Sequence, residues 1–295
     1  MKGMTLMSHN KSWRTAFLPA TPRLIEQYEI NGMRLFDDSF IKNFHSKFTL
    51  FMMQFKIIRD LERMMLDIFS KGAFGLILCR TKYIDDVLQI SIDNGIQQVV
   101  ILGAGLDTRP YRIESSDNLK VVEVDLPIMQ NIKKRKVRKC LGELPTHITY
   151  VPIDFNKQSL EEVLSNEVLD TGKPIFFIWE GVTQYITEEA VKSTFRFISK
   201  AVIGSAVVFS YILKDVIDKT SDIEGINDVM DYFITKDQSW EFGLEPSNVG
   251  EFLKPFKLIT IEDVGDSYYQ ERYLKPIGRK LDVSEMERVI YAKKI

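Results

Sequence analysis

The chain has 295 residues, of which 45% are hydrophobic, so it can bury the core of one large folded domain. Its 39 basic and 41 acidic residues nearly cancel, which excludes a strong field of one sign that would attract nucleic acid or an anionic membrane. Two cysteines, Cys79 and Cys140, are too few for a disulfide framework or a four-thiolate metal site. We therefore expect a cytoplasmic protein without metal, nucleic-acid or membrane partners.

The N-terminal region, residues 22–70, is predicted to be helical and to cover the rest of the fold. Apolar residues recur at helical spacing in FTLFMMQFKIIRDLERMMLDIF (48–69), and Gly72 follows as a stop. The methionine and phenylalanine stripe from Phe48 to Phe69 favours ordinary core packing. A lid over an apolar substrate is the alternative.

From about residue 80 the pattern changes to short apolar runs that alternate with helices. Five runs (99–102, 121–124, 148–153, 175–179 and 206–212) are typical of strands buried on both faces. The helices predicted at 81–93, 127–141 and 187–201 supply the crossovers of a parallel sheet, and 258–264 with 287–295 would add an antiparallel edge. We predict one doubly wound α/β domain, 1–295, with helical cover over 1–79 and a cofactor-binding core over 80–295.

The strongest chemical signal is the sequence QQVVILGAGLDTRPYRI, in which a buried strand runs into Gly103, Ala104 and Gly105. Small residues at this turn allow backbone N–H groups to approach a ligand closely. Asp125 follows about twenty residues later, with Leu126, at the end of the next strand. A carboxylate there can accept hydrogen bonds from both hydroxyls of a ribose. A tight turn with a helix-capping aspartate is the structural alternative.

The glycine turn also indicates which nucleoside cofactor is bound. GAGLDTR carries Thr108 where a dinucleotide fingerprint has its third glycine, and the chain has no P-loop sequence. Pyrophosphate binding is therefore disfavoured, and S-adenosylmethionine, which has no phosphate, is the predicted cofactor. An NAD-linked oxidoreductase and a cofactor-binding protein without transfer activity remain as alternatives.

Further polar residues end the third and fourth strands, at the carboxyl edge where such sheets bind ligands. Asp154 and Phe155 would contact adenine through the carboxylate and the ring, although Asp154 is an equally good cap for the following helix. Glu180 follows IFFIW and would hold the ammonium group of the cofactor. Tyr185 lies in the loop expected to pass over the cofactor, or is simply packed.

Arg80 precedes the predicted helix over 81–93. A guanidinium there can pair bidentately with the cofactor carboxylate. By spacing alone, a surface arginine at a helix end is the favoured interpretation.

Together these segments resemble the leucine carboxyl methyltransferase superfamily, which includes protein phosphatase methyltransferases and polyketide carboxyl methyltransferases. The resemblance covers roughly 80–200, with weaker likeness at 23–40 and 240–256. It rests on five segments: RTKYID (80–85), VVILGAGLDTR (99–109), VVEVDLP (121–127), YVPIDF (150–155) and WEGVTQYI (179–186).

The resemblance implies a seven-stranded Rossmann-like methyltransferase sheet and the following contacts. Arg80 would bind the methionyl carboxylate, Gly103 and Gly105 the cofactor backbone, Asp125 the ribose, Asp154 and Phe155 the adenine, and Glu180 the amino group. Tyr185 matches a catalytic tyrosine that approaches the acceptor carboxylate. Arg23 and Lys42 are further candidates in the N-terminal region.

The chain has three histidines, His9, His45 and His147, and none lies in the cofactor motifs. A carboxylate acceptor is already ionised at neutral pH and needs no general base, so this favours a carboxylate over a hydroxyl, of a small metabolite or a peptide C-terminus. Tyr185 or His45 as a base would leave the hydroxyl open. The basic run KKRKVRK (133–139) has no interleaved aromatic residues, and a solvated helical face is expected.

Overall fold

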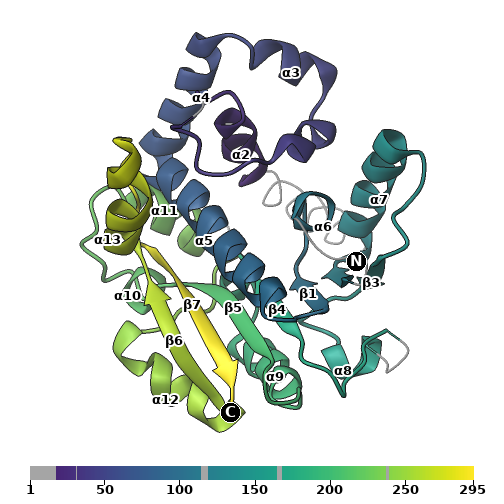
Figure 1. Ribbon diagram of the computed structural model, residues 1–295. Helices are drawn as coiled ribbons and strands as arrows, with labels where there is room; N and C mark the ends of the chain where they lie inside the picture. Colours follow the sequence, from purple (N-terminus) through teal and green to yellow (C-terminus); the bar gives the residue numbers. More distant parts are fainter. Residues whose placement is uncertain (1–17, 31, 114–118, 165–167, 237–238) are drawn as a thin grey trace, which may run out of the picture.

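A computed structural model describes residues 18–30, 32–113, 119–164, 168–236 and 239–295 (Figure 1). Within these ranges seven strands form one sheet in the order β3-β2-β1-β4-β5-β7-β6. β1 to β5 pair in parallel, and β7 runs antiparallel to both β5 and β6, which confirms the predicted antiparallel edge. The strands are β1 (Gln98–Leu102), β2 (Lys120–Asp125), β3 (Ile148–Pro152), β4 (Phe176–Trp179), β5 (Ala206–Ile212), β6 (Leu258–Val264) and β7 (Glu287–Lys294).

Helices cover both faces of the sheet, which confirms the doubly wound fold. Alternate residues of β1, such as Val99 and Val100, belong to separate apolar clusters on the two faces. The first cluster includes residues of α5 and the second includes residues of α9. The strands β1, β4 and β5 between them are buried along their whole length because neither face meets water. The reversal of strand order between β1 and β4 leaves a crevice at the carboxyl ends of these strands.

The helices and helical turns have the bounds that follow. In the first half they are α2 (Ala20–Glu26), η1 (Ser39–Phe44), α3 (Lys47–Met52), α4 (Lys56–Phe69), α5 (Ala73–Asp93), α6 (Arg109–Arg112) and α7 (Pro127–Leu141). In the second half they are α8 (Leu160–Val163), η2 (Thr183–Tyr185), α9 (Glu188–Ile198), α10 (Lys214–Ile217), α11 (Asn227–Val229), η3 (Met230–Lys236), η4 (Pro246–Asn248), α12 (Val249–Leu253), η5 (Lys254–Phe256), α13 (Asp266–Tyr269), η6 (Gln270–Leu274) and η7 (Lys275–Ile277). No helix in the described ranges is long and apolar enough to cross a bilayer.

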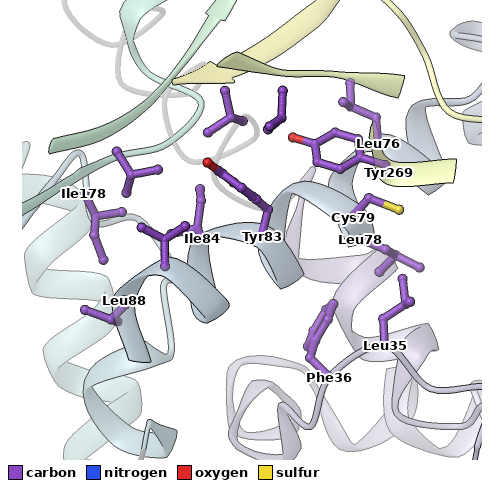
Figure 2. Close-up of a cluster of buried hydrophobic side chains, with 14 of the residues drawn as sticks. Leu35, Phe36, Leu76, Leu78, Cys79, Tyr83, Ile84, Leu88, Ile178 and Tyr269 are labelled. Carbon is purple, nitrogen blue, oxygen red and sulfur yellow. The ribbon is translucent and has the colours of Figure 1, made fainter. Parts of the chain in front are cut away.

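Helix α5 begins at Ala73, eight residues before the predicted start at 81, and the predicted domain boundary at 79/80 falls inside it. Most of its residues are buried, so it lacks the one-sided polarity that marks a surface helix. In Figure 2, Ile84 and Leu88 lie beside Ile178 of β4, while Leu78 lies beside Leu35. The helix is thus held between the sheet and the N-terminal segment.

The N-terminal region is helical as predicted, but in short pieces, and one expectation about it is wrong. The stripe predicted to pack in the core is largely exposed: Phe48 is 72% exposed, Ile57 76% and Ile68 69%. Neither α3 nor α4 has a buried residue. Periodicity shows that a helix has an apolar face but not which way that face points.

The basic run on α7 is also only partly solvated. Lys133 is 2% exposed and its Nζ lies 2.6 Å from Glu123 Oε1 on β2. Nζ of Lys136 donates to the carbonyl of Phe44. The expected solvated face is wrong for Lys133, because Glu123 on the preceding strand supplies a buried acidic partner.

Candidate functional site

The described residues enclose a cavity of about 520 Å³ at the carboxyl ends of the parallel strands. It lies in the crevice that the reversed strand order creates, between the sheet edge and the N-terminal helices. All ten residues predicted from the sequence line it. They are Arg80, Gly103, Ala104, Gly105, Asp125, Leu126, Asp154, Phe155, Glu180 and Tyr185.

The glycine turn after β1 brings backbone close to the cavity. Gly103 has φ +68°, and a Cβ there would overlap the side chain of Val182. The N–H groups of Gly103 and Ala104 both donate to the carbonyl of Val124, at 2.7 and 3.1 Å, which ties the turn to β2. Any larger residue at Gly103 would be strained in its backbone and would displace the loop after β4.

Asp125, the last residue of β2, is held by two backbone donors. Its carboxylate accepts the N–H of Gly105 at 2.5 Å and the N–H of Leu126 at 2.6 Å. Burial raises the pKa of Asp125, while these two bonds act in the opposite direction. A carboxylate has about four acceptor positions, so two remain for the hydroxyls of a ribose.

Arg80 lies inside α5, not at a helix end, and its side chain is buried. Its Nε donates to Glu180 at 2.9 Å, and its Nη1 contacts both carboxylate oxygens of Glu287 at 2.7 and 2.6 Å. The remaining nitrogen, Nη2, lies beside Gly181. The surface interpretation of Arg80 is wrong. Bidentate pairing with a cofactor carboxylate would require Arg80 to release one of these acids, whereas a contact through Nη2 would not.

Glu180 is also bonded by a second arginine that the sequence reasoning missed. Arg109 Nη1 lies 2.7 Å from Glu180, and the same guanidinium contacts Asp107 and Asp85 at 2.7 Å each. Burial alone would raise the pKa of Glu180, but Arg109 and Arg80 lower it overall, so the carboxylate stays ionised. Glu180 is therefore a fixed anion in the cavity wall.

Glu287 and Arg109 are the main functional candidates that sequence reasoning did not single out. Glu287 is 3% exposed and lies on β7, 207 residues from its partner Arg80. No local pattern marks this pairing, because the first residue of an antiparallel strand is not a usual ligand position. Arg109 did carry a signal, since Asp107 and Arg109 directly follow the glycine turn in GAGLDTR.

Asp154 and Phe155 line the cavity directly after β3. Asp154 accepts the N–H of Asn156 at 3.2 Å and pairs with Lys157 at 2.5 Å. The alternative that Asp154 caps the following helix is wrong, because Ser159 caps α8 in a capping box. Asp154 thus shapes a turn at the cavity rim.

Another part of the cavity wall, around Tyr185 and Trp240, is apolar and aromatic. The ring of Tyr185 lies edge-on to that of Trp240, with centroids 6.3 Å apart, and Trp240 stacks on Phe233 at 4.6 Å. Other apolar side chains complete this wall. They are Leu66, Phe69, Ala73, Leu76, Ile77, Val229 and Met286.

Of the two N-terminal candidates, Arg23 lines the cavity and Lys42 is not among the lining residues. Arg23 is paired with Asp38 at 2.6 Å and donates to Thr108 Oγ1 at 2.7 Å. Thr108 is fully buried, so the position of a third glycine is filled by a side chain that ties the turn to the N-terminal cover. Lys42 instead lies over the ring of Tyr28.

Solved structures share this methyltransferase-like architecture. The chain is similar to a structure described as a putative methyltransferase from Thermobifida fusca, with a TM-score of 0.57 and 14% identity over 81% of this chain and 89% of that one. A second, a duf574 family protein from Streptomyces avermitilis, has a TM-score of 0.55 and 15% identity, covering 81% and 91%. Likeness at these identities shows the fold.

The profile of the leucine carboxyl methyltransferase family matches residues 16–199, and the chain belongs to this family. This confirms the assignment made from the sequence. A Bacillus subtilis relative, named "Putative S-adenosyl-L-methionine-dependent methyltransferase YktD", is 38% identical over 45% of this chain and 44% of its own length. A relative with a similar name from Mycolicibacterium smegmatis is 35% identical over 39% of each chain. The chain thus matches less than half the length of these curated relatives.

Proposed function

We propose that this chain is an S-adenosylmethionine-dependent O-methyltransferase that acts on a carboxylate, or a hydroxyl, of a small metabolite or a peptide C-terminus. The observation that carries the proposal is the convergence of Asp125, Glu180 and Arg80 on one cavity with the glycine turn. The family and the names of its relatives support the same cofactor.

The residues that line the cavity fit S-adenosylmethionine, which has no phosphate to bind. Asp125 has acceptor positions left for a ribose, Glu180 is an anion for an ammonium group, and Arg80 Nη2 is a donor for a carboxylate. Phe155 offers a ring for adenine. When bound, the cofactor supplies an electrophilic methyl group on a sulfonium.

The protein's own contribution is to position the acceptor and to exclude water. Tyr185 and Trp240 form the wall beside which the acceptor would lie, and the apolar side chains around them leave few groups to hold water. We propose that Tyr185 contacts the oxygen that receives the methyl group. A carboxylate acceptor at neutral pH has no proton to lose, so neither Tyr185 nor any other residue of this wall needs to act as a general base.

We further propose that residues 1–295 act as one methyltransferase domain. Residues 1–79 would cover the cavity and 80–295 would form the cofactor-binding core. Arg23 in the cover bonds Thr108 in the core, and α5 runs across the boundary without a break, which supports one cooperative unit.

The cofactor is tested by calorimetric titration with S-adenosylmethionine, S-adenosylhomocysteine and NAD in parallel. We expect saturable binding of the first two and none of NAD. Binding of NAD alone would replace the proposal with an oxidoreductase. A different outcome is that the protein binds S-adenosylmethionine but forms no S-adenosylhomocysteine with any of a broad panel of carboxylate and hydroxyl acceptors. That result would replace the proposal with a cofactor-binding protein without transfer activity.

The role of Tyr185 is tested with Tyr185→Phe, which keeps the ring and removes the hydroxyl. We expect cofactor affinity to stay within about twofold and turnover to fall by at least tenfold. A variant with full turnover would reject contact between this hydroxyl and the acceptor.

A further inference from the structure

Helices α3 and α4 lie at the side of the molecule away from β6 and α12 (Figure 1), and they present apolar side chains to solvent. This surface, the α3–α4 apolar face, is defined by eight side chains that are between 45% and 76% exposed. They are Phe48, Phe51, Phe55, Ile57, Leu61, Met64, Met65 and Ile68. Monomeric proteins rarely expose a contiguous apolar patch of more than a few hundred Å².

The orientation of α4 is set by the side that carries Arg59 and Arg63, which packs on the rest of the protein. The guanidinium of Arg59 lies over the ring of Tyr28 at 5.0 Å, and that of Arg63 over the ring of Phe74 at 5.4 Å. Arg59 also donates to the carbonyls of Met53 and Gln54. An amphipathic helix ordinarily buries its apolar stripe, so the outward stripe indicates a second surface that covers it.

The spacing of the exposed residues matches packing against another helix. Ile57, Leu61, Met64 and Ile68 are separated by four, three and four residues, the spacing of a coiled-coil seam. An antiparallel pair of α4 helices about a twofold axis would place Ile57 of one copy opposite Ile68 of the other, and Leu61 opposite Met64. The helix dipoles would then run in opposite directions.

The exposed area is close to what a stable dimer needs. Taking full side-chain areas of about 150 to 250 Å², the eight residues expose on the order of 800 Å². A standard interface covers about 800 Å² on each partner. The net charge of −2 raises little repulsion between two copies.

The charge of α4 argues against a lipid surface as the occupant. The helix carries three basic residues, Lys56, Arg59 and Arg63, and three acidic residues, Asp60, Glu62 and Asp67. Helices that lie on anionic membranes have an excess of lysine and arginine on the polar side. The equal numbers of basic and acidic residues on α4 fit contact with a second copy of this chain better than contact with an anionic membrane.

We propose that the α3–α4 apolar face is the interface of a homodimer, formed by antiparallel packing of α4 against α4 of a second copy. Leu66 and Phe69 of the same helix line the cavity, so the dimer would also fix the position of one cavity wall. This proposal does not depend on the proposed function.

The test is sedimentation velocity of the full chain over a range of concentrations, with Leu61→Glu, Met64→Glu and a control variant. We expect the wild type to sediment as a species of twice 34.2 kDa. Either glutamate should weaken dimerisation by at least a hundredfold. The control is Ile90→Glu, which changes an isoleucine on α5 that is 58% exposed and outside the face, and which should stay dimeric.

A wild type that is monomeric at every concentration would overturn the proposal, as would Leu61→Glu and Met64→Glu variants that dimerise as tightly as wild type. Thermal unfolding of each variant checks that the fold is retained. Flotation with phosphatidylcholine and phosphatidylglycerol vesicles tests whether the face binds a lipid surface instead. A monomer that floats with vesicles, and loses this with Leu61→Glu, would assign the face to lipid and overturn the dimer.

Discussion

Two ion pairs of equal length lie in opposite parts of the molecule. Under the glycine turn, Lys133 Nζ is 2.6 Å from Glu123, and the two side chains are 2% and 1% exposed. On α4, Lys56 Nζ is 2.6 Å from Asp60, and these side chains are 79% and 58% exposed. The first pair belongs to the sheet edge that forms the cavity, and the second to the helix with the exposed apolar face.

The comparison shows that burial, not distance, decides how much such a pair matters to folding. An exposed pair is screened by water and must immobilise two long side chains, so its net contribution is about 0 to 1 kcal/mol. Removing one partner of a buried pair leaves an uncompensated charge in the interior. The sheet edge is thus rigidly specified by polar contacts, whereas α4 tolerates changes of charge on its outer surface.

The largest effect is expected from Lys133→Met, which leaves Glu123 buried without its cation. We expect the free energy of unfolding to fall by about 3 to 5 kcal/mol, measured by urea denaturation at pH 8. Burial raises the pKa of Glu123 to about 7, with Lys133 acting in the opposite direction. The loss should therefore shrink at pH 5.5, where the variant can protonate Glu123. A loss below 1 kcal/mol at pH 8 would contradict the role of burial.

The next effect concerns His45, at the end of η1 in the N-terminal cover. Burial lowers the pKa of His45 to about 4, below its ordinary 6.5. The folded-state pKa is the lower one, so His45 stabilises the fold above pH 6.5 and this contribution is lost as the pH falls from 6.5 to about 4. The loss should amount to about 2 to 3 kcal/mol. Denaturation of wild type and His45→Gln at several pH values would show it as the part of the pH dependence that the wild type has and the variant lacks.

Asp125→Ala tests the cavity end of the sheet edge. Loss of hydrogen bonds to a charged group should weaken S-adenosylmethionine binding by about 1 to 3 kcal/mol, or roughly 5- to 150-fold, in a calorimetric titration. Asp93→Ala, at the exposed end of α5, is the control and should bind normally. Unchanged affinity of Asp125→Ala would remove the ribose assignment.

The smallest effect is expected from Lys56→Met, the exposed counterpart of Lys133→Met. The free energy of unfolding should change by less than about 0.5 kcal/mol, because the pair is solvated. A loss comparable to that of Lys133→Met would break the comparison between the two regions.

Much of the fold followed from local sequence patterns. The apolar runs predicted β5 and β6 to the residue, and each end of the remaining strands to within one residue. The acids at the strand ends were found for the same reason, since parallel strands bring their carboxyl ends to one edge. Residues as far apart as Asp125 and Glu180 could therefore be assigned to one site without a structure, whereas Arg80 was assigned to it only through the resemblance to the family.

Local sequence patterns did not predict which charged residues pair with each other, where α5 begins, or which way the apolar face of α4 points. The start of α5 was missed because a helix buried all round shows little periodicity. The outward face of α4 was predicted as core, since an apolar stripe has the same pattern whether the protein or another copy covers it.

The sequence by itself determined the order of strands and helices, the glycine turn and the family, because each depends on residues close together along the chain. Only the tertiary structure decided that Glu287 binds Arg80, that Lys133 is buried with Glu123, and that α4 turns its apolar side outward. These features depend on which distant residues share a low-dielectric interior, where charges must find partners. The spacing of residues along the chain does not predict these contacts.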